Sequence, residues 1–263
     1  MKTKKILNKL IYFLMLLICG QATIAQINID TINSQNYRLD TSLLKDANNT
    51  YLVYFTDSTK TNKIGPENLW ERSVKKGKYD SKDVYKFEWK WITNNEVVKQ
   101  TSNICDALTL APISHSSIDK TPNGNIVKAY KFENGFMIKD KNEINNSVND
   151  DFKLKINIPV LNWELDIETY PLLPIKMVGQ IFEISFFDVN QHEPKYQRYE
   201  VIGEETLRIP NDKKMSCWLL KINYDDKNSA IFWLSKKNGE MIKCEEKVAM
   251  KKGIIYSFKE KQF

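Results

Sequence analysis

The stretch YKFEWKW, residues 85–91, decides the fold class of this chain. Aromatic and charged residues alternate through it without a break. Because successive side chains of a β-strand point to opposite faces, a strand here puts the aromatic rings on one face and the charges on the other. The stretch therefore predicts a strand with one aromatic face, formed by Tyr85, Phe87, Trp89 and Trp91.

The same pattern recurs along the chain, and turn residues separate its copies. Apolar or alternating stretches that predict further strands lie at residues 51–55, 152–158, 182–186, 218–224 and 254–258. Asn94-Asn95 and three Asn-Gly pairs, at 123–124, 134–135 and 238–239, favour tight hairpins, because Asn and Gly tolerate positive φ. The sequence thus predicts a mainly β fold, an antiparallel meander. The last pair also predicts a register, with Lys237 opposite Glu240 and Trp233 opposite Cys244.

The stretch Asn162–Tyr170 fits two structures. A strand would put Trp163, Leu165 and Ile167 on one face, whereas a helix would stack Trp163, Ile167 and Tyr170 and begin at Asn162 as N-cap. Acidic residues near the positive end of the dipole favour the helix. We expect one or two short helices, with this one ended by the prolines that follow.

The first 25 residues are typical of a secretory signal. A basic start, an apolar run ending at Cys19 and small residues up to Ala25 form its three parts, which predicts cleavage after Ala25. An uncleaved anchor is one alternative, and lipidation at Cys19 is another, although Ile18 is bulky for a lipobox. We expect a periplasmic or secreted protein, or one that is lipid-anchored to the outer membrane.

Residues 26–50 are polar and rich in asparagine, and we expect them to be a loose lead-in without regular elements. A single β-rich domain is expected over 51–263. No second apolar run is long enough to span a bilayer, so no integral membrane span is expected after cleavage.

Net charge gives little support for an anionic macromolecular partner. The chain has 39 basic and 33 acidic residues, and its first 25 residues hold four lysines and no acid. Cleavage after Ala25 therefore leaves 35 basic and 33 acidic residues, a net charge of +2. The four arginines, at positions 38, 72, 198 and 208, form no cluster. We expect no nucleic-acid partner.

Few residues suggest catalysis. His115 lies between Ser114 and Ser116 in an expected strand, and His192 lies in a polar turn. No nucleophile elbow, phosphate loop or His-Glu-x-x-His motif accompanies them. Paired acids, such as Asp225-Asp226, are ordinary turn residues. We expect no catalytic residues and no cofactor.

Three cysteines follow the leader: Cys105, Cys217 and Cys244. Their spacing does not fit a zinc site, so we expect no metal. Strands 217–224 and 241–248 are expected to flank a third strand, which puts Cys217 and Cys244 about 10 Å apart. That separation is too long for a disulfide, so we predict free thiols.

The aromatic face of residues 85–91 is the best candidate for a ligand-facing surface. Tyr85, Phe87, Trp89 and Trp91 would then line a groove for a lipid or a sugar. The competing interpretation, which we favour, is that these rings belong to the core, because aromatic side chains dominate protein cores.

Several motifs resemble a secreted domain-of-unknown-function family of Gram-negative bacteria. They are DALTLAPI at 106–113, YPLLP at 170–174, Gly179, YEVIGEE at 199–205, CWLL at 217–220 and FWLSKK at 232–237. The resemblance implies a periplasmic or surface location and a curved antiparallel sheet, similar to the half-barrel of lipoprotein carriers. It implies no activity and no catalytic residue.

The hypothesis that the sequence favours is a non-enzymatic envelope protein that binds a lipid, another hydrophobic or amphipathic ligand, or a partner on a curved sheet. One alternative is an envelope glycan or ester hydrolase, which would use His115 with Ser114 or Ser116. The other alternative is a structural or assembly module.

Overall fold

The computed structural model describes residues 29–189 and 193–263. The predicted signal peptide, Cys19 and His192 therefore lie outside the described residues. Within those residues, no helix has the length and apolar character needed to cross a bilayer.

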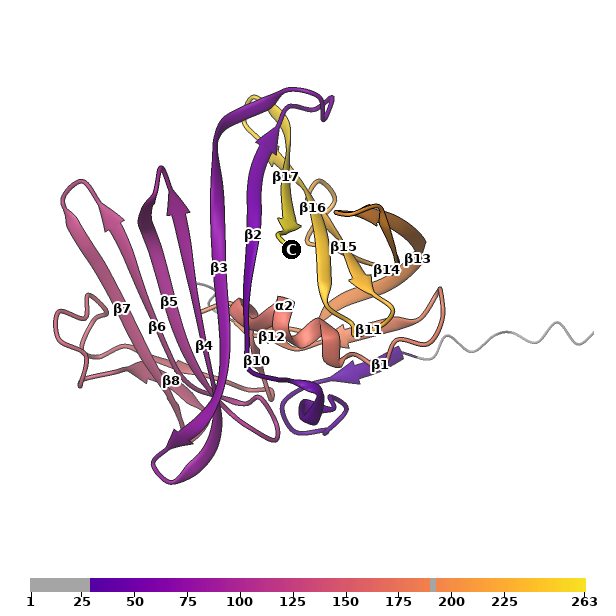
Figure 1. Cartoon of the computed structure of the whole chain (residues 1–263). Helices are drawn as coiled ribbons and strands as arrows, with labels where there is room; N and C mark the ends of the chain where they lie inside the picture. The colour runs from indigo at the N-terminus through magenta and orange to yellow at the C-terminus, as the bar shows by residue number, and fades with distance from the viewer. Residues whose placement is uncertain (1–28, 190–192) are drawn as a thin grey trace, which may run out of the picture.

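One sheet of fifteen strands makes up most of the described fold (Figure 1). Its order is β1-β11-β13-β14-β15-β16-β17-β2-β3-β4-β5-β6-β7-β8-β9. Every neighbouring pair is antiparallel except β1 and β11, which are parallel. Residues 29–155 contribute β1 Ile29–Ile32, β2 Ala47–Thr56, β3 Lys63–Tyr79, β4 Lys82–Thr93, β5 Glu96–Asp106, β6 Pro112–Thr121, β7 Gly124–Glu133, β8 Phe136–Lys139 and β9 Lys153–Lys155.

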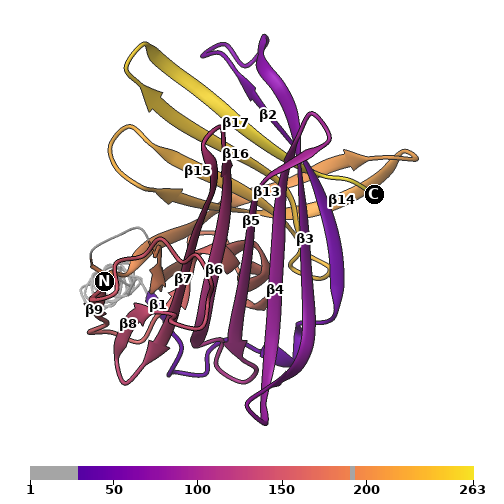
Figure 2. The same ribbon diagram turned by 90° about the vertical axis from the view of Figure 1, so that its left-hand side faces the viewer.

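The rest of the chain adds three short strands and a second run of hairpins. These strands are β10 Leu161–Asn162, β11 Ile181–Ile184, β12 Phe186–Phe187, β13 Gln197–Ile209, β14 Lys213–Asn223, β15 Ser229–Ser235, β16 Met241–Met250 and β17 Gly253–Lys261. Strands β10 and β12 form a separate parallel pair. The last strand, β17, pairs with β2, so the two runs of hairpins form one curved sheet (Figure 2). The expected mainly β, antiparallel, curved fold is confirmed.

Strand β4 contains the stretch on which the fold class was predicted. Tyr85, Phe87 and Trp89 are buried, whereas Lys86 and Glu88 between them are exposed, as a period of two requires. The turn to β5 has φ values of 51° and 63° at Asn94 and Asn95. The predicted strand and its hairpin are both confirmed.

The Asn-Gly turns differ from one another. Asn134 and Gly135 form a two-residue turn between β7 and β8, as predicted. Between β6 and β7, Thr121 pairs with Gly124, so the turn residues are Pro122 and Asn123 rather than Asn123 and Gly124.

The register predicted for the Asn238-Gly239 turn is wrong. Trp233 lies opposite Lys243 rather than opposite Cys244, and the register shifts between Trp233 and Leu234. This β-bulge adds a residue to β16. Ser235 N donates to Glu240 O, so the connection spans the four residues 236–239 and not two.

Gly239 has a φ of 72°, and a Cβ atom there would lie 2.5 Å from Pro171 Cα. Contact with a distant segment therefore fixes the glycine, which the sequence pattern alone did not reveal.

The described part of the expected lead-in, residues 29–50, contains more regular structure than we expected. Strand β1 pairs in parallel with β11, and its residue Ile32 is fully buried. A 3₁₀ turn, η1, spans Thr41–Leu43, and β2 begins at Ala47. A four-residue strand paired with residues about 150 positions away leaves little local signal, because its stability comes from tertiary contacts.

The stretch that fitted both a strand and a helix is helical, as we favoured. It consists of η2 Trp163–Leu165, α2 Asp166–Thr169 and η3 Tyr170–Leu172, here called the helical segment. Asn162 caps its start, because its side chain accepts a hydrogen bond from Glu164 N at 3.0 Å. The segment lies between the two runs of hairpins that form the curved sheet (Figure 1).

The main core fills the space between the helical segment and the sheet. Fully buried rings from four elements meet there: Tyr51, Tyr170, Phe186 and Tyr199. Cys105, Cys217 and Cys244 are buried and form no disulfide, which confirms the free thiols predicted for these positions.

Candidate functional site

The aromatic face of β4 is covered over most of its length. The Tyr85 hydroxyl shares its one proton between Leu44 O at 3.0 Å and Thr41 O at 3.2 Å, and Phe87 is 2% exposed. Trp89 is buried next to Trp70, with ring centroids 5.5 Å apart. Of the four rings, Trp91 alone is half-buried. Tyr85 and Phe87 are therefore core residues, and only the Trp91 end of the stripe reaches solvent.

A pocket of about 620 Å³ lies between η1, the start of β2, the helical segment and the β15–β16 turn. We call it the end pocket. Its buried floor consists of Tyr51, Tyr170 and Leu234, all at most 1% exposed. The Tyr51 hydroxyl donates to Met241 O at 3.3 Å. The hydroxyl at the floor thus already has a partner, and the floor presents apolar surface.

Lysines surround the open side of the end pocket. Lys45 precedes β2, while Lys236 and Lys237 begin the β15–β16 turn, and all three are exposed. Lys236 Nζ lies 3.7 Å from the centre of the Trp218 ring and 2.5 Å from Glu204 Oε2. Trp218 also lines the pocket, so Lys236 holds one of its aromatic walls in place. The pocket therefore combines an apolar floor with a basic rim.

The β15–β16 turn is held against the helical segment by backbone contact. The close approach of Gly239 to Pro171 leaves no room for a side chain at position 239. Both residues line the end pocket. The glycine therefore sets the distance between two walls of the pocket.

Charged side chains also gather around the helical segment. Arg72 on β3 donates from Nε to Glu168 Oε1 at 2.7 Å and from Nη2 to Glu168 Oε2 at 2.5 Å. Arg72 Nη2 also donates to Glu164 O at 2.7 Å. Arg72 is 5% exposed and Glu168 is 8% exposed, so this is a buried, bidentate ion pair.

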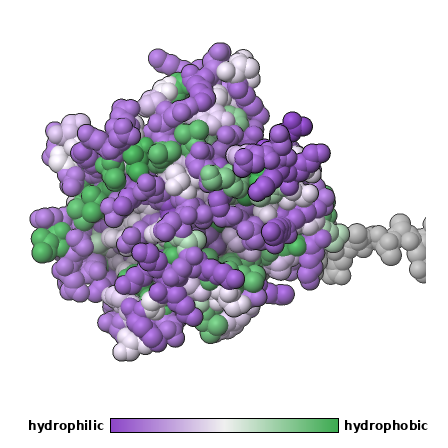
Figure 3. All heavy atoms as spheres, in the orientation of Figure 1, coloured by the Kyte–Doolittle hydropathy of each residue, from purple (hydrophilic) through white to green (hydrophobic). Residues whose placement is uncertain are grey.

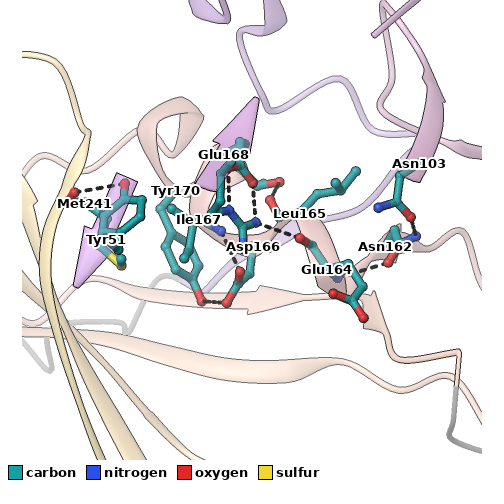
Figure 4. Close-up of polar contacts among 12 residues, drawn as sticks. Tyr51, Asn103, Asn162, Glu164, Leu165, Asp166, Ile167, Glu168, Tyr170 and Met241 are labelled. Atoms are coloured by element: carbon teal, nitrogen blue, oxygen red, sulfur yellow. Dashed lines mark hydrogen bonds and ion pairs between the residues drawn. The ribbon is translucent and has the colours of Figure 1, made fainter. Parts of the chain in front are cut away.

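Three more residues complete this polar cluster, which is defined as Arg72, Glu168, Asp166, Lys259 and Glu246. Asp166 accepts hydrogen bonds from the Tyr170 hydroxyl at 3.2 Å and from Ile167 N at 2.7 Å (Figure 4). Burial raises the pKa of Asp166 to about 6, and Arg72 opposes this increase. Lys259 and Glu246 form an ion pair at 2.5 Å.

All members of the polar cluster except Glu168 border a cavity of only about 80 Å³. Trp70, Trp89 and Trp163 form its aromatic walls. The indole N–H groups of Trp70 and Trp89 have no well-formed hydrogen-bond partner among the described residues. A cavity of this size has room for about two water molecules, so it is too small for an organic ligand.

His115 is buried in the wall of the sheet, away from both serines. Its Nδ1 atom lies 2.7 Å from Asn103 Oδ1, and Asn162 Nδ2 donates to the same oxygen at 2.8 Å. Burial, with smaller contributions from Lys99 and Lys128, lowers the pKa of His115 to about 3. Ser114 and Ser116 precede and follow it on β6 and so point to the opposite face. The structure therefore does not bring together the residues on which the hydrolase hypothesis depended.

The end pocket and the polar cluster were not predicted from the sequence. In the sequence, Trp218 and Lys237 belong to an expected strand, an expected turn and the family motifs, and no local pattern assigns them to a pocket. Nothing local distinguishes Arg72 or Lys259 from other charged residues, since their partners lie on distant strands. Among the described residues, no group of three or more His, Cys, Asp or Glu side chains is arranged to hold a metal ion.

Comparison with known proteins places the chain in a family and supports the fold. A family model described as a protein of unknown function, DUF3108, matches residues 50–253. The crystal structure of a beta-barrel-like protein of domain of unknown function DUF1849 from Brucella abortus is similar, with a TM-score of 0.51 at 12% identity. That likeness covers 83% of this chain and 96% of the other, and it shows a shared barrel-like fold.

A DUF1329 family protein from Desulfovibrio piger ATCC 29098 is more distant. Its TM-score is 0.31 at 7% identity, over 84% of this chain and 85% of the other, and we draw no argument from it. No curated protein matches the chain. The resemblance to a family without an assigned activity, inferred from the sequence motifs, is confirmed.

Proposed function

Because the chain belongs to the DUF3108 family, whose description assigns no activity, we propose a function from its own geometry. We propose that this is an exported envelope protein that binds a hydrophobic or amphipathic ligand in the end pocket, without chemical change to the ligand. The observation that carries the proposal is an apolar pocket of about 620 Å³ with a polar, basic rim.

The size and lining of the end pocket support this proposal. Ligand sites in proteins are commonly concave, 300–1,000 Å³ in volume and mostly apolar, with a few polar groups that orient the ligand. The cavities of about 380, 360 and 530 Å³ have no fully buried ring among the described residues of their walls. An apolar ligand gains about 25 cal/mol for each Å² of surface that it removes from water.

The proposed location rests on the leader rather than on the fold. Residues 1–25 have the parts of a secretory signal, and Cys19 offers the alternative of a lipid anchor. The mass of the mature N-terminal peptide distinguishes the two: an N-terminus at Gln26 indicates a free envelope protein, whereas a modified Cys19 indicates an anchored one. An intact Met1 in exported material would contradict both.

Binding without catalysis is proposed because the groups that suggested catalysis do not meet. His115 is bonded to Asn103, and the neighbouring serines lie on the opposite face of β6. We propose no nucleic-acid partner, since the mature chain is nearly neutral and its arginines are dispersed.

The experiment that tests this function is titration calorimetry of the mature protein with dodecyl amphiphiles below their micelle concentration. Leu43 lines the end pocket and is 57% exposed, so Leu43→Asp places a charge there with little effect on folding. Ile144→Asp is the matched control, because Ile144 is 79% exposed and lies outside the pocket.

We expect the wild type and Ile144→Asp to bind the dodecyl amphiphile saturably, one molecule per protein. Leu43→Asp should bind it at least tenfold more weakly. Absence of binding to the wild type would overturn the proposed function. Equal weakening in the two variants would move the site away from the end pocket.

A further inference from the structure

We infer that the ligand of the end pocket is a single-chain amphiphile with an anionic headgroup, whose alkyl chain lies on the apolar floor and whose headgroup lies at the lysine rim. This inference rests on the proposed function and narrows it to one chemical class. The charges, the satisfied polar atoms and the volume of the pocket carry it.

The charges at the rim do not cancel. Two acids also line the end pocket, but Glu168 is paired with the buried Arg72 and Glu240 is paired with Lys261. Lys236 is paired with Glu204. Lys45 and Lys237, by contrast, form no ion pair with any described residue, so the rim keeps a positive charge that complements an anion.

The floor of the pocket favours an alkyl chain over a sugar or a peptide. The hydroxyl groups of Tyr51 and Tyr170 donate to Met241 O and Asp166 Oδ2, respectively. Their donor capacity is therefore used inside the protein. A hydroxyl-rich or amide-rich ligand would lose its hydrogen bonds to water there without full replacement, which is costly, whereas a hydrocarbon loses none.

The position of the lysines gives the ligand a direction. Tyr51, Tyr170 and Leu234 are buried, whereas Lys45 and Lys237 are exposed, so the pocket grades from apolar to charged toward solvent. The surface shown in Figure 3 is mostly hydrophilic, with hydrophobic side chains in smaller patches. An alkyl chain therefore gains more by entering the pocket than by lying on that face. One ligand of ordinary size matches a volume of about 620 Å³.

The test compares three ligands that share a dodecyl chain: dodecanoate, dodecyl maltoside and dodecyltrimethylammonium. We expect the anion to bind the wild type about tenfold or more tightly than the cation, with the neutral maltoside between them. Added salt should weaken dodecanoate binding alone. Each methylene removed from the carboxylate should weaken its binding about fourfold.

The matched variants are the double substitutions Lys45→Gln/Lys237→Gln at the rim and Lys251→Gln/Lys252→Gln in the exposed β16–β17 turn. The rim variant should bind dodecanoate three- to tenfold more weakly and dodecyl maltoside unchanged. The turn variant should bind both as the wild type does. Equal loss in the two variants would overturn the inference, since only net charge would then matter.

The outcomes separate this inference from the proposed function. Similar affinity for all three dodecyl ligands would overturn the anionic preference and leave ligand binding in place. Binding of none of them would overturn both. Sedimentation with phosphatidylglycerol vesicles in the absence of dodecanoate binding would assign the lysines to a membrane surface, and would overturn the single-chain ligand.

Discussion

The helical segment separates two cavities of opposite character. On one side lies the end pocket, about 620 Å³ in volume, with an apolar floor. On the other lies a cavity of about 80 Å³, bordered by most of the polar cluster. Ile167 lines both, so a single turn of helix forms the wall between them.

The difference indicates that some residues of this short segment hold it in place while others form the pocket wall. A helix of four residues has too few internal hydrogen bonds to be stable alone, so contacts with the sheet must hold it in place. Those contacts include the ion pair of Arg72 with Glu168, which also lines the end pocket, and apolar packing around the pocket floor. The cluster therefore positions the wall that the pocket uses.

Breaking the buried ion pair should have the largest effect. Arg72→Met leaves the Glu168 carboxylate buried without a partner, which should lower the free energy of unfolding by about 3–5 kcal/mol. Urea unfolding measures the loss.

The control is the double variant Arg72→Met/Glu168→Leu, which removes both charges. It should recover most of the stability, because a well-packed apolar pair often replaces a buried ion pair at no cost. A double variant as unstable as Arg72→Met would show that shape, and not the unpaired charge, is responsible.

On the pocket side, the corresponding contact is the one between Gly239 and Pro171. Gly239→Ala combines a strained φ of 72° with a Cβ atom 2.5 Å from Pro171 Cα. We expect a loss of about 2–4 kcal/mol in the free energy of unfolding, as strain and overpacking add.

Gly65→Ala is a closely matched control, because Gly65 has the same φ of 72° and no atom near its Cβ position. It should lose only about 1–2 kcal/mol from backbone strain. If the two variants were equally stable, the contact with Pro171 would not matter. Ligand affinity should fall in Gly239→Ala and stay unchanged in Gly65→Ala.

The sequence predicted the strands well because period two is a local property. The alternation at Tyr85–Trp91 and the turns at Asn94-Asn95 and Asn134-Gly135 need only neighbouring residues. The parallel pairing of β1 with β11 and the bulge at Trp233 depend on distant partners. Local periodicity carries no information about either.

The site was harder to predict than the fold for the same reason. The aromatic stripe attracted attention because it is compact in sequence, yet Tyr85 and Phe87 are core residues. The end pocket gathers Lys45, Trp218 and Lys237 from separate elements, and β17 must pair with β2 before these elements meet. Only the cap at Asn162 was visible locally, and it too bonds to a distant residue, Asn103.

Two titratable groups at the helical segment should change the stability of the protein in opposite directions as pH changes. The first is His115 on β6, which lies next to Asn162, the N-cap of the segment. The pKa of His115 is lowered to about 3 by burial, so the folded protein resists protonation there. The stability that neutral His115 contributes is present above its unfolded pKa of about 6.5 and is lost as pH falls from about 6.5 toward 3.

Between pH 7 and pH 5, this loss should reach about 2 kcal/mol, measured by urea unfolding at each pH. His115→Gln should flatten that part of the profile, since its side chain does not titrate. An unchanged slope in the variant would mean that another group governs the dependence.

The second group is Asp166, near the middle of the segment. Its titration should change the free energy of unfolding in the direction opposite to that of His115, and by the least of the four predicted effects. Burial raises its pKa to about 6, so the folded state binds a proton more tightly than the unfolded chain does. Stability from this group is therefore present at low pH and is lost as pH rises through the window between about 4 and 6, by about 2 kcal/mol or less, since Asp166 is partly exposed to solvent. Asp166→Asn keeps the shape and an acceptor oxygen for the Tyr170 hydroxyl. Urea unfolding of this variant should therefore lack that loss of stability, except for a small part due to Glu164, whose pKa burial also raises.

Dodecanoate affinity should be the same in Asp166→Asn and the wild type at pH 7, because this carboxylate faces the polar cluster and not the end pocket. A variant that loses ligand affinity as well would show that the helical segment does not insulate the two sides from each other.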